Sequence, residues 1–261
     1  MNTQTNPEFK DILSLVESLP VIAPFETNST DALSWITDWL AHHSRVYDFT
    51  KGFNVNRCAL YWSGYDKVDD FDGQKFVDSC QDSRGSLRQL AQILDTDLQI
   101  FELDPHNHTK PTSTALAMAA SYGMMAIDES TQLFCAASFG QGVDMAAKES
   151  IEALEKTDNF DLEKFMVDHC GLDHAAILGC AIAATMKGIP MVIEGNVGVF
   201  IARLLCRATN RPITNIIATA AMPPLTNNKS VGHDMVTTAI LLRMLYIGAN
   251  KTDCGKVKIA A

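Results

Sequence analysis

The chain has 261 residues, of which 47% are hydrophobic and 20% charged, and its formal net charge is −10. This balance is typical of a globular protein with a large core and excludes a disordered chain. The acidic excess argues against a nucleic-acid-binding or anionic-membrane surface, because both need clustered Lys and Arg. It does not exclude a phosphorylated small molecule bound in a local positive pocket.

The cysteine positions and the apolar runs indicate in which cellular compartment the protein is expected. The seven cysteines stand at positions 58, 80, 135, 170, 180, 206 and 254 without paired spacing. This scatter favours a reducing compartment and no disulfide framework. The first residues lack a basic start followed by an apolar run, and the apolar run over 175–193 is interrupted by Lys187, Gly188 and Pro190. We therefore expect a cytoplasmic protein that does not enter a membrane.

Two helices are predicted before the first strand. Apolar residues recur at helical spacing over 7–19 and again over 30–45, the second run following the cap residues Asn28 and Ser29. We expect residues 1–50 to form a helical segment, as a small domain or a dimer contact. Residues 51–261 are expected to form an α/β domain.

Strands and helices alternate through the rest of the chain. Strands are predicted over 58–62, 98–103, 132–137, 189–193 and 213–218. Helices are predicted over 73–94 with a break near Gly85, over 114–127, 143–154 and 175–187, from about 197 to 209, and over 235–245. Residues 155–161 are expected to be an acidic connector. The alternation predicts a doubly wound, mostly parallel sheet with helices on both faces.

The segment after the fourth predicted strand is the first candidate site. That strand is apolar on both faces, as a covered parallel strand should be, and Glu194, Gly195 and Asn196 follow it directly. In open α/β sheets, ligands bind where the carboxyl ends of strands meet helix N-termini. The Glu194 carboxylate could hold ribose hydroxyls or a substrate nitrogen. In the alternative, Asn196 caps the helix and Glu194 forms an ion pair.

The segment after the third predicted strand, Ser138-Phe139-Gly140-Gln141-Gly142, is the second candidate. Its two glycines allow a ligand to approach the backbone, and the following helix N-terminus offers amides to a phosphate or carboxylate. A tight turn without a ligand is the alternative. The segment lacks the third glycine of the dinucleotide fingerprint and the Lys-Ser/Thr ending of the phosphate loop, so neither NAD nor ATP binding is supported.

Histidines offer further candidates. His233, between Gly232 and Asp234, has the side chain of a general base that works near neutral pH, although a surface or capping role is the alternative. His106 and His108 lack a third ligand at a suitable spacing, which favours a solvated loop over a metal site. We expect no metal and no cofactor.

The residues above resemble one family. The segment 171–205, GLDHAAILGCAIAATMKGIPMVIEGNVGVFIARLL, resembles the Gly-Phe-Glu-Ile-Ala-Ala-Leu…Ile-Pro-Val-Leu-Leu-Asp-Gly-Phe segment of nicotinate-nucleotide–dimethylbenzimidazole phosphoribosyltransferases, which act in cobalamin lower-ligand synthesis. The segment 84–104 is similar to the family's Gly-Ala-Ala-Ile-Asn-x-Leu-Ala-Arg…Leu-x-Val-Val-Asp. Order and spacing agree from about residue 58 to residue 247.

The resemblance implies a homodimeric glycosyltransferase that moves a phosphoribosyl group from nicotinate mononucleotide to an aromatic base. In that reaction a carboxylate deprotonates the base nitrogen, which attacks ribose C1, and carboxylates stabilise the positive charge on the sugar. The resemblance makes His233 and Glu194 the catalytic candidates. It implies substrate binding by Ser138, Gly140, Gly142, Asp173, Gly195, Asn196 and Gly232.

The chain departs from the family pattern at several of these positions. The family's base glutamate falls on His233, its glycine-loop glutamate on Ser138, and the aspartate of Asp-Gly-Phe on Glu194. An acidic loop over 67–72 replaces the base-binding stretch, and the uncharged residues 220–224 replace the phosphate loop. Two interpretations follow. The chain is a divergent phosphoribosyltransferase with His233 or Glu194 as base, or it is a non-catalytic relative with a binding or regulatory role.

Overall fold

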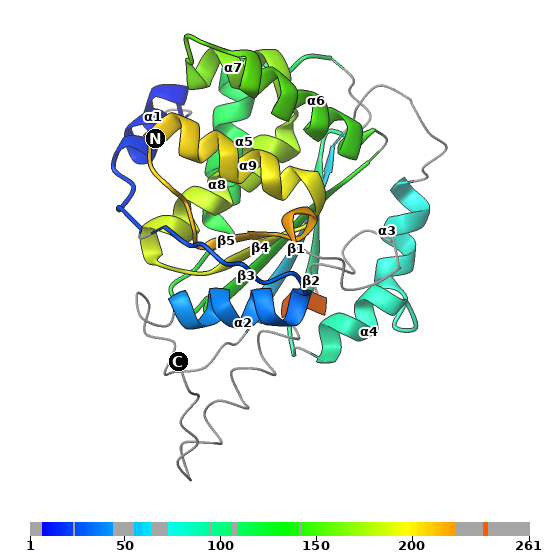
Figure 1. Ribbon diagram of the computed structural model, residues 1–261. Coiled ribbons are helices and arrows are strands. Elements are labelled where there is room, and N and C mark those ends of the chain that lie inside the picture. The colour runs from blue at the N-terminus through cyan, green and yellow to red at the C-terminus, as the bar shows by residue number, and fades with distance from the viewer. Residues whose placement is uncertain are drawn as a thin grey trace.

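Five parallel strands form the central sheet (Figure 1). The computed structural model describes residues 7–22, 24–43, 55–63, 73–93, 95–105, 109–140, 142–222 and 237–239. The strands are β1 (Val55–Ser63), β2 (Asp97–Leu103), β3 (Leu133–Phe139), β4 (Met191–Ile193) and β5 (Ile216–Ala218). The helices are α1 (Phe9–Glu17), α2 (Ala32–His43), α3 (Gly73–Gln81), α4 (Ser86–Ile93), α5 (Ser113–Met125), α6 (Val143–Lys156), α7 (Leu162–His169), α8 (Leu172–Lys187) and α9 (Gly195–Thr209), with a 3-10 turn, η2, at Thr219–Ala221.

The strand order is β2-β1-β3-β4-β5. From β1 the chain moves outward to β2 and then returns across β1 to β3, so the direction of winding reverses between β1 and β3. Crossovers between parallel strands are right-handed, and a reversal of direction therefore puts the connecting helices on opposite faces. The doubly wound α/β architecture predicted from the sequence is confirmed.

Each face of the sheet has its own hydrophobic core. Alternate residues of a strand point to opposite faces, and Ala59 and Tyr61 of β1 lie in the core with α1, α5, α6, α7, α8 and α9. Cys58 and Leu60 lie in the other core with α2, α3 and α4. Figure 1 shows the larger helical layer above the sheet, with α2 and α4 below it.

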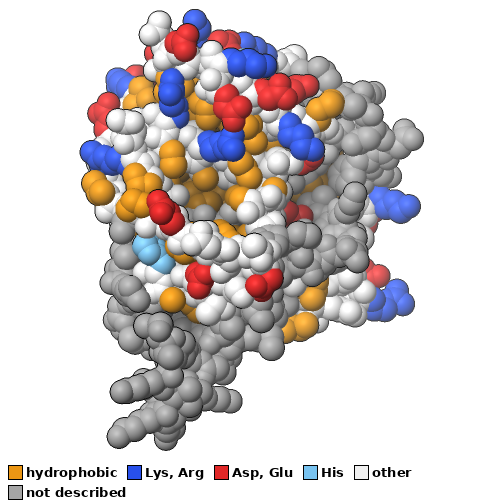
Figure 2. Space-filling view, in the orientation of Figure 1, with side chains coloured by type: hydrophobic (Ala, Val, Ile, Leu, Met, Phe, Trp, Pro, Cys, Tyr) orange, Lys and Arg blue, Asp and Glu red, His pale blue; other side chains and the backbone are white. Residues whose placement is uncertain are grey.

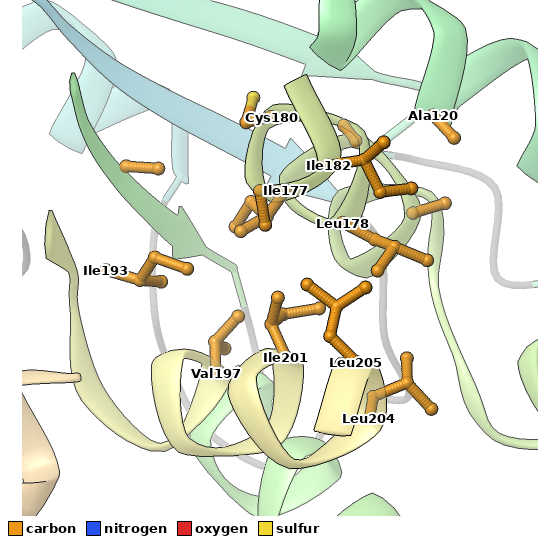
Figure 3. Packing of buried hydrophobic residues seen from close by; sticks show 14 of the residues in the cluster. Ala120, Ile177, Leu178, Cys180, Ile182, Ile193, Val197, Ile201, Leu204 and Leu205 are labelled. Atoms are coloured by element: carbon orange, nitrogen blue, oxygen red, sulfur yellow. The ribbon is translucent and has the colours of Figure 1, made fainter. Parts of the chain in front are cut away.

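Helices α5, α8 and α9 pack closely on the larger face. Side chains of α8 such as Ile177 and Leu178 point toward Val197 and Ile201 of α9 (Figure 3). On the other side of α8 the contact is between backbones. A Cβ at Gly123 of α5 would lie 1.8 Å from the carbonyl oxygen of Ala176.

The structure corrects one predicted boundary and adds one helix. Helix α6 continues to Lys156, into the stretch predicted to be a connector. Helix α7 was not predicted, although Asp161 caps it by accepting a hydrogen bond of 2.8 Å from the Lys164 backbone amide. Of the helix predicted over 235–245, only residues 237–239 are described, and these are helical. The break predicted near Gly85 is confirmed, since α3 ends at Gln81 and α4 begins at Ser86.

The outer surface mixes charges. Lys and Arg side chains are interspersed with Asp and Glu on the helices in the upper part of Figure 2. Several form exposed ion pairs, among them Lys148–Asp144 and Lys110–Asp168, each at 2.6 Å. Among the helices that the structure describes, none combines the length and the apolar character needed to cross a membrane.

Candidate functional site

The predicted site residues that the structure describes gather at the carboxyl edge of the sheet. Strands β3 and β4 pair with Ala136 opposite Ile193, so the segments that follow them, which begin at Gly140 and Glu194, leave the sheet side by side. This edge includes the point between β1 and β3 where the winding reverses, which is the usual ligand position in sheets of this order.

A buried hydrogen bond joins two of the predicted residues. The Ser138 hydroxyl at the end of β3 donates to Oδ2 of Asp173 in the first turn of α8, and both residues are buried. A buried carboxylate is costly unless it is hydrogen-bonded, so this contact holds Asp173 at the strand end. The resemblance aligns Ser138 with a glutamate. In this chain the Asp173 carboxyl group, which comes from α8, therefore lies next to the position of the family's glutamate.

His174, next to Asp173, is also buried, and its ring lies 5.1 Å from that of Phe200. Burial lowers the pKa of His174, and the charge of Asp173 offsets this only in part. The ring is therefore neutral at pH 7 and belongs to the apolar packing behind the site.

The turn after β3 requires its two glycines. Gly140 has φ +145°, and a Cβ there would lie 2.5 Å from the carbonyl oxygen of Ser63 at the end of β1. Gly142 has φ +74° and is the N-cap of α6. The turn thus lies against β1 at the reversal point, with the amides of the α6 N-terminus beside it.

The turn after β4 is held by η2, which follows β5. Gly195 has φ +67°, and its backbone N–H donates to the Thr219 hydroxyl at 2.9 Å. No heavy atom of the described residues lies within 4 Å of the place where a Cβ of Gly195 would be. Glu194 is half-buried, and its backbone N–H donates to the Ala136 carbonyl at 3.0 Å. Glu194, rather than Asn196, occupies the N-cap position of α9.

Asn196 is engaged with a residue that the sequence did not single out. Its Nδ2 donates to Oδ1 of Asp144 in α6, while Lys148 Nζ lies 2.6 Å from Oδ2 of the same carboxylate. Burial raises the pKa of Asp144, but the hydrogen bonds from Lys148 and Asn196 outweigh it and lower the pKa overall. The ionised carboxylate ties the N-terminus of α6 to that of α9. In the sequence, Asp144 could have been singled out as an acidic residue in the first turn of a helix that begins after a glycine.

A cleft of about 200 Å³ lies at the ends of β1 and β2, beside the N-termini of α5 and α8. Its lining comprises Ser63, Leu103, Asp104, Thr109, Lys110, Pro111, Thr112, Ala115, Gly171 and Leu172. Ligand pockets usually have volumes of roughly 300–1,000 Å³, so the cleft fits a single ring or one polar group rather than a whole nucleotide. Leu172 precedes Asp173, which places the cleft beside the Ser138–Asp173 pair. The sequence predicted only a loop over 106–114.

Part of the predicted site lies outside the described residues. This applies to His233, Gly232 and Gln141, and to the stretch 67–72 that replaces the family's base-binding segment. Within the described ranges, no group of three or more His, Cys, Asp or Glu side chains is placed to hold a metal ion.

The fold of this chain is similar to that of two solved structures. CobT from Thermus thermophilus is 13% identical, with a TM-score of 0.62 over 90% of this chain and 95% of that one. Nicotinate-nucleotide–dimethylbenzimidazole phosphoribosyltransferase from the same organism is 14% identical, with a TM-score of 0.62 over 93% of this chain and 95% of that one. No family model and no curated protein matches the sequence. At this identity the comparison establishes the fold, and the resemblance inferred from the sequence is confirmed at that level.

Proposed function

We propose that this protein is a phosphoribosyltransferase that moves the phosphoribosyl group of nicotinate mononucleotide to a benzimidazole-type base. The observation that carries the proposal is the pair of carboxylates, Asp173 and Glu194, beside two glycine turns at the reversal edge of the sheet. The fold that this chain shares with a nicotinate-nucleotide–dimethylbenzimidazole phosphoribosyltransferase supports the same activity.

The proposed chemistry needs negative charge near the ribose. The base nitrogen attacks C1 as the C1–N bond to nicotinate breaks, so positive charge develops on the sugar and carboxylates stabilise it. Glu194 is the half-buried carboxylate at the edge and is proposed to face the ribose, with the buried Asp173 side chain at the end of the neighbouring strand β3. We assign proton removal from the incoming base to His233. The turns at Gly140–Gly142 and Gly195 offer amides for the phosphate.

The partners follow from this chemistry. The protein binds a small nucleotide and an aromatic base, needs no cofactor, and works as a homodimer in the cytoplasm.

Two observations favour a second candidate, a non-catalytic protein that binds the nucleotide or the base. The Asn196 amide is occupied by Asp144, and η2, at the position of the family's phosphate loop, carries only Thr219, Ala220 and Ala221. A phosphate there would meet no charged side chain from η2.

The experiment incubates the purified full chain with nicotinate mononucleotide and 5,6-dimethylbenzimidazole and measures released nicotinate and the new riboside phosphate by chromatography. Glu194→Gln should lower kcat by roughly 10²–10³-fold, the usual cost of removing one group that stabilises charge in the transition state, whereas Glu149→Gln, on an exposed part of α6, should not change it. His233→Ala should remove the rate dependence near pH 6.5, the ordinary pKa of histidine. Saturable binding of either ligand without turnover supports the second candidate. Neither binding nor turnover overturns both.

A further inference from the structure

The cleft at the ends of β1 and β2 has no part in the proposed transfer reaction, whose phosphate is assigned to the turns after β3 and β4. It has a volume of about 200 Å³ and lies where the N-termini of α5 and α8 meet the sheet. Its polar side chains come from Ser63, Asp104, Thr109, Lys110 and Thr112. These groups, together with the backbone of α8, determine which kind of ligand the cleft can take.

Ser63, the last residue of β1, supplies a buried hydroxyl. Side chains alternate along a strand, so Ser63 shares the face of Tyr61, which packs toward α5 and α8. Ser63 is only 4% exposed, and within the described part of the chain its hydroxyl has no hydrogen-bond partner. Buried polar groups are normally paired, and an unpaired one is costly. The Ser63 hydroxyl is therefore available to a molecule in the cleft.

The N-terminus of α8 is open to the cleft. Its N-cap is Gly171, which has no side chain to accept a hydrogen bond, and both Gly171 and Leu172 line the cleft. The first backbone amides of a helix have no acceptor within that helix and carry partial positive charge. The N-terminus of α5 differs, because Thr112 Oγ1 accepts a hydrogen bond of 3.2 Å from the Ala115 N–H. An anionic oxygen in the cleft would cap α8 as Thr112 caps α5.

Two charged residues line the cleft, and they have different roles. Lys110 has three N–H donors, of which one goes to Asp168 of α7 at 2.6 Å, so the ammonium group is held in place and keeps donors for a ligand. Asp104 follows β2 directly and is exposed. Its carboxylate repels a second negative group at the opening. The lining therefore suits a ligand with one oxyanion group.

We propose that the cleft binds one carboxylate or phosphate group of a small molecule. The anionic oxygens accept hydrogen bonds from the Ser63 hydroxyl, from the α8 backbone at Leu172 and from the Lys110 ammonium group. Helix N-termini bind anions in this way in many proteins. The rest of the ligand is no larger than a single ring, since pockets for larger ligands have volumes of roughly 300–1,000 Å³. The inference does not depend on the transfer reaction proposed above.

The test measures binding of inorganic phosphate and of benzoate to the full chain by isothermal titration calorimetry at constant ionic strength. Phosphate is the bare oxyanion, and benzoate joins one carboxylate to one ring. At least one of the two should bind saturably. Lys110→Gln should weaken this binding by roughly tenfold, the effect of losing one charge-assisted hydrogen bond. Phosphate bound at the turns after β3 and β4 instead would not respond to Lys110→Gln.

Asp104→Asn should strengthen the binding, because the repelling charge is lost. Asparagine adopts the φ of +51° that Asp104 has, so the backbone is kept. A merely structural role of these residues would not make one substitution weaken binding and the other strengthen it. Lys156→Gln is the matched control, since Lys156 forms an exposed ion pair with Glu152 on α6, and it should leave the binding unchanged.

Ser63→Ala separates a ligand contact from a structural contact. It should weaken binding, while the midpoint of urea unfolding without ligand should stay the same, because the hydroxyl loses no bond within the described part of the chain. A lower midpoint would assign the hydroxyl a partner in the protein and overturn the proposal. So would a chain that binds neither anion, binding that Lys110→Gln or Ser63→Ala leaves unchanged, or binding that Asp104→Asn fails to strengthen.

Discussion

The Ser138 hydroxyl donates a hydrogen bond to the Asp173 carboxylate and thereby joins the carboxyl end of β3 to the first turn of α8. The two residues are 35 positions apart in the chain and both are buried. The bond fixes the position of the Asp173 carboxyl group near the reversal point of the sheet, next to the cleft at the ends of β1 and β2. Its contribution can be measured independently of any activity.

Ser138→Ala should destabilise the protein by about 1.5–3 kcal/mol, because the Asp173 carboxylate loses a donor that water does not replace in a buried place. Urea unfolding measures the difference. Ser14→Ala is the matched control, since the Ser14 hydroxyl bonds its own helix at an exposed position, and its effect should stay within about 0.5 kcal/mol. Equal effects of the two substitutions would contradict the importance of the Ser138–Asp173 bond.

Gly195→Ala should cost about 1–2 kcal/mol from backbone strain alone, because φ is +67° and no heavy atom of the described residues lies close to the Cβ position. Gly195→Asn should cost less, since asparagine adopts this conformation more readily than alanine does. The pair separates strain from steric overlap. If asparagine is as destabilising as alanine, crowding and not φ controls this position.

Gly123→Ala and Gly179→Ala should each destabilise the protein by about 3 kcal/mol or more. The added Cβ would lie 1.8 Å from the Ala176 carbonyl oxygen in one case and 1.9 Å from the Ala120 carbonyl oxygen in the other. Overpacking of a core usually costs about 1–3 kcal/mol, and a clash with backbone cannot be relieved by turning a side chain. Thermal unfolding should show a large fall in Tm for both, although alanine favours helix by about 1 kcal/mol. A Tm near that of the wild type would mean that the helices separate easily.

Stability should fall as the pH drops from 6.5 toward 4 because of His43. This residue is buried against the Trp39 ring, and burial, together with the neighbouring His42, lowers its pKa from 6.5 to about 4. In that window the unfolded chain binds a proton that the folded chain does not, so the stabilisation present above pH 6.5 is lost by up to about 3 kcal/mol.

The control for this pH effect is His43→Phe, which keeps an apolar ring beside Trp39. The variant should lose much of the pH dependence of the unfolding free energy between pH 6.5 and 4.5. A smaller dependence should persist, because burial also lowers the pKa of His174. The assignment fails if the variant and the wild type show the same slope.

The fold could be predicted from the sequence because its strands have clear local patterns. The run from Ile189 to Ile193 is apolar on both faces and ends at Glu194-Gly195, which places it in a covered parallel sheet. Helix α7 was missed because it follows an acidic stretch and has only 8 residues, too few for a clear period. The start of α7 depends on capping by one side chain, that of Asp161.

The site was predicted in part, for a physical reason. Glycines with positive φ, such as Gly140 and Gly195, are visible in a sequence as turn residues after strands. Partners such as Thr219 for Gly195, or Asp144 for Asn196, come from other elements, and pairing of that kind is set by tertiary packing. The cleft was missed because ten residues from several segments line it, and no local pattern joins them.

The glycine contacts between α5 and α8 bear on how a ligand would enter the cleft. The two helices touch through backbone at Gly123 and Gly179, and the residues at their N-termini, Thr112 and Gly171, line the cleft. Backbone contacts have no rotamers to exchange, so we expect this helix pair to resist sliding and spreading when a ligand enters. We therefore expect the spacing between the α5 and α8 N-termini at the cleft to be set by backbone contacts more than one helical turn away, and the cleft to favour ligands that fit this spacing.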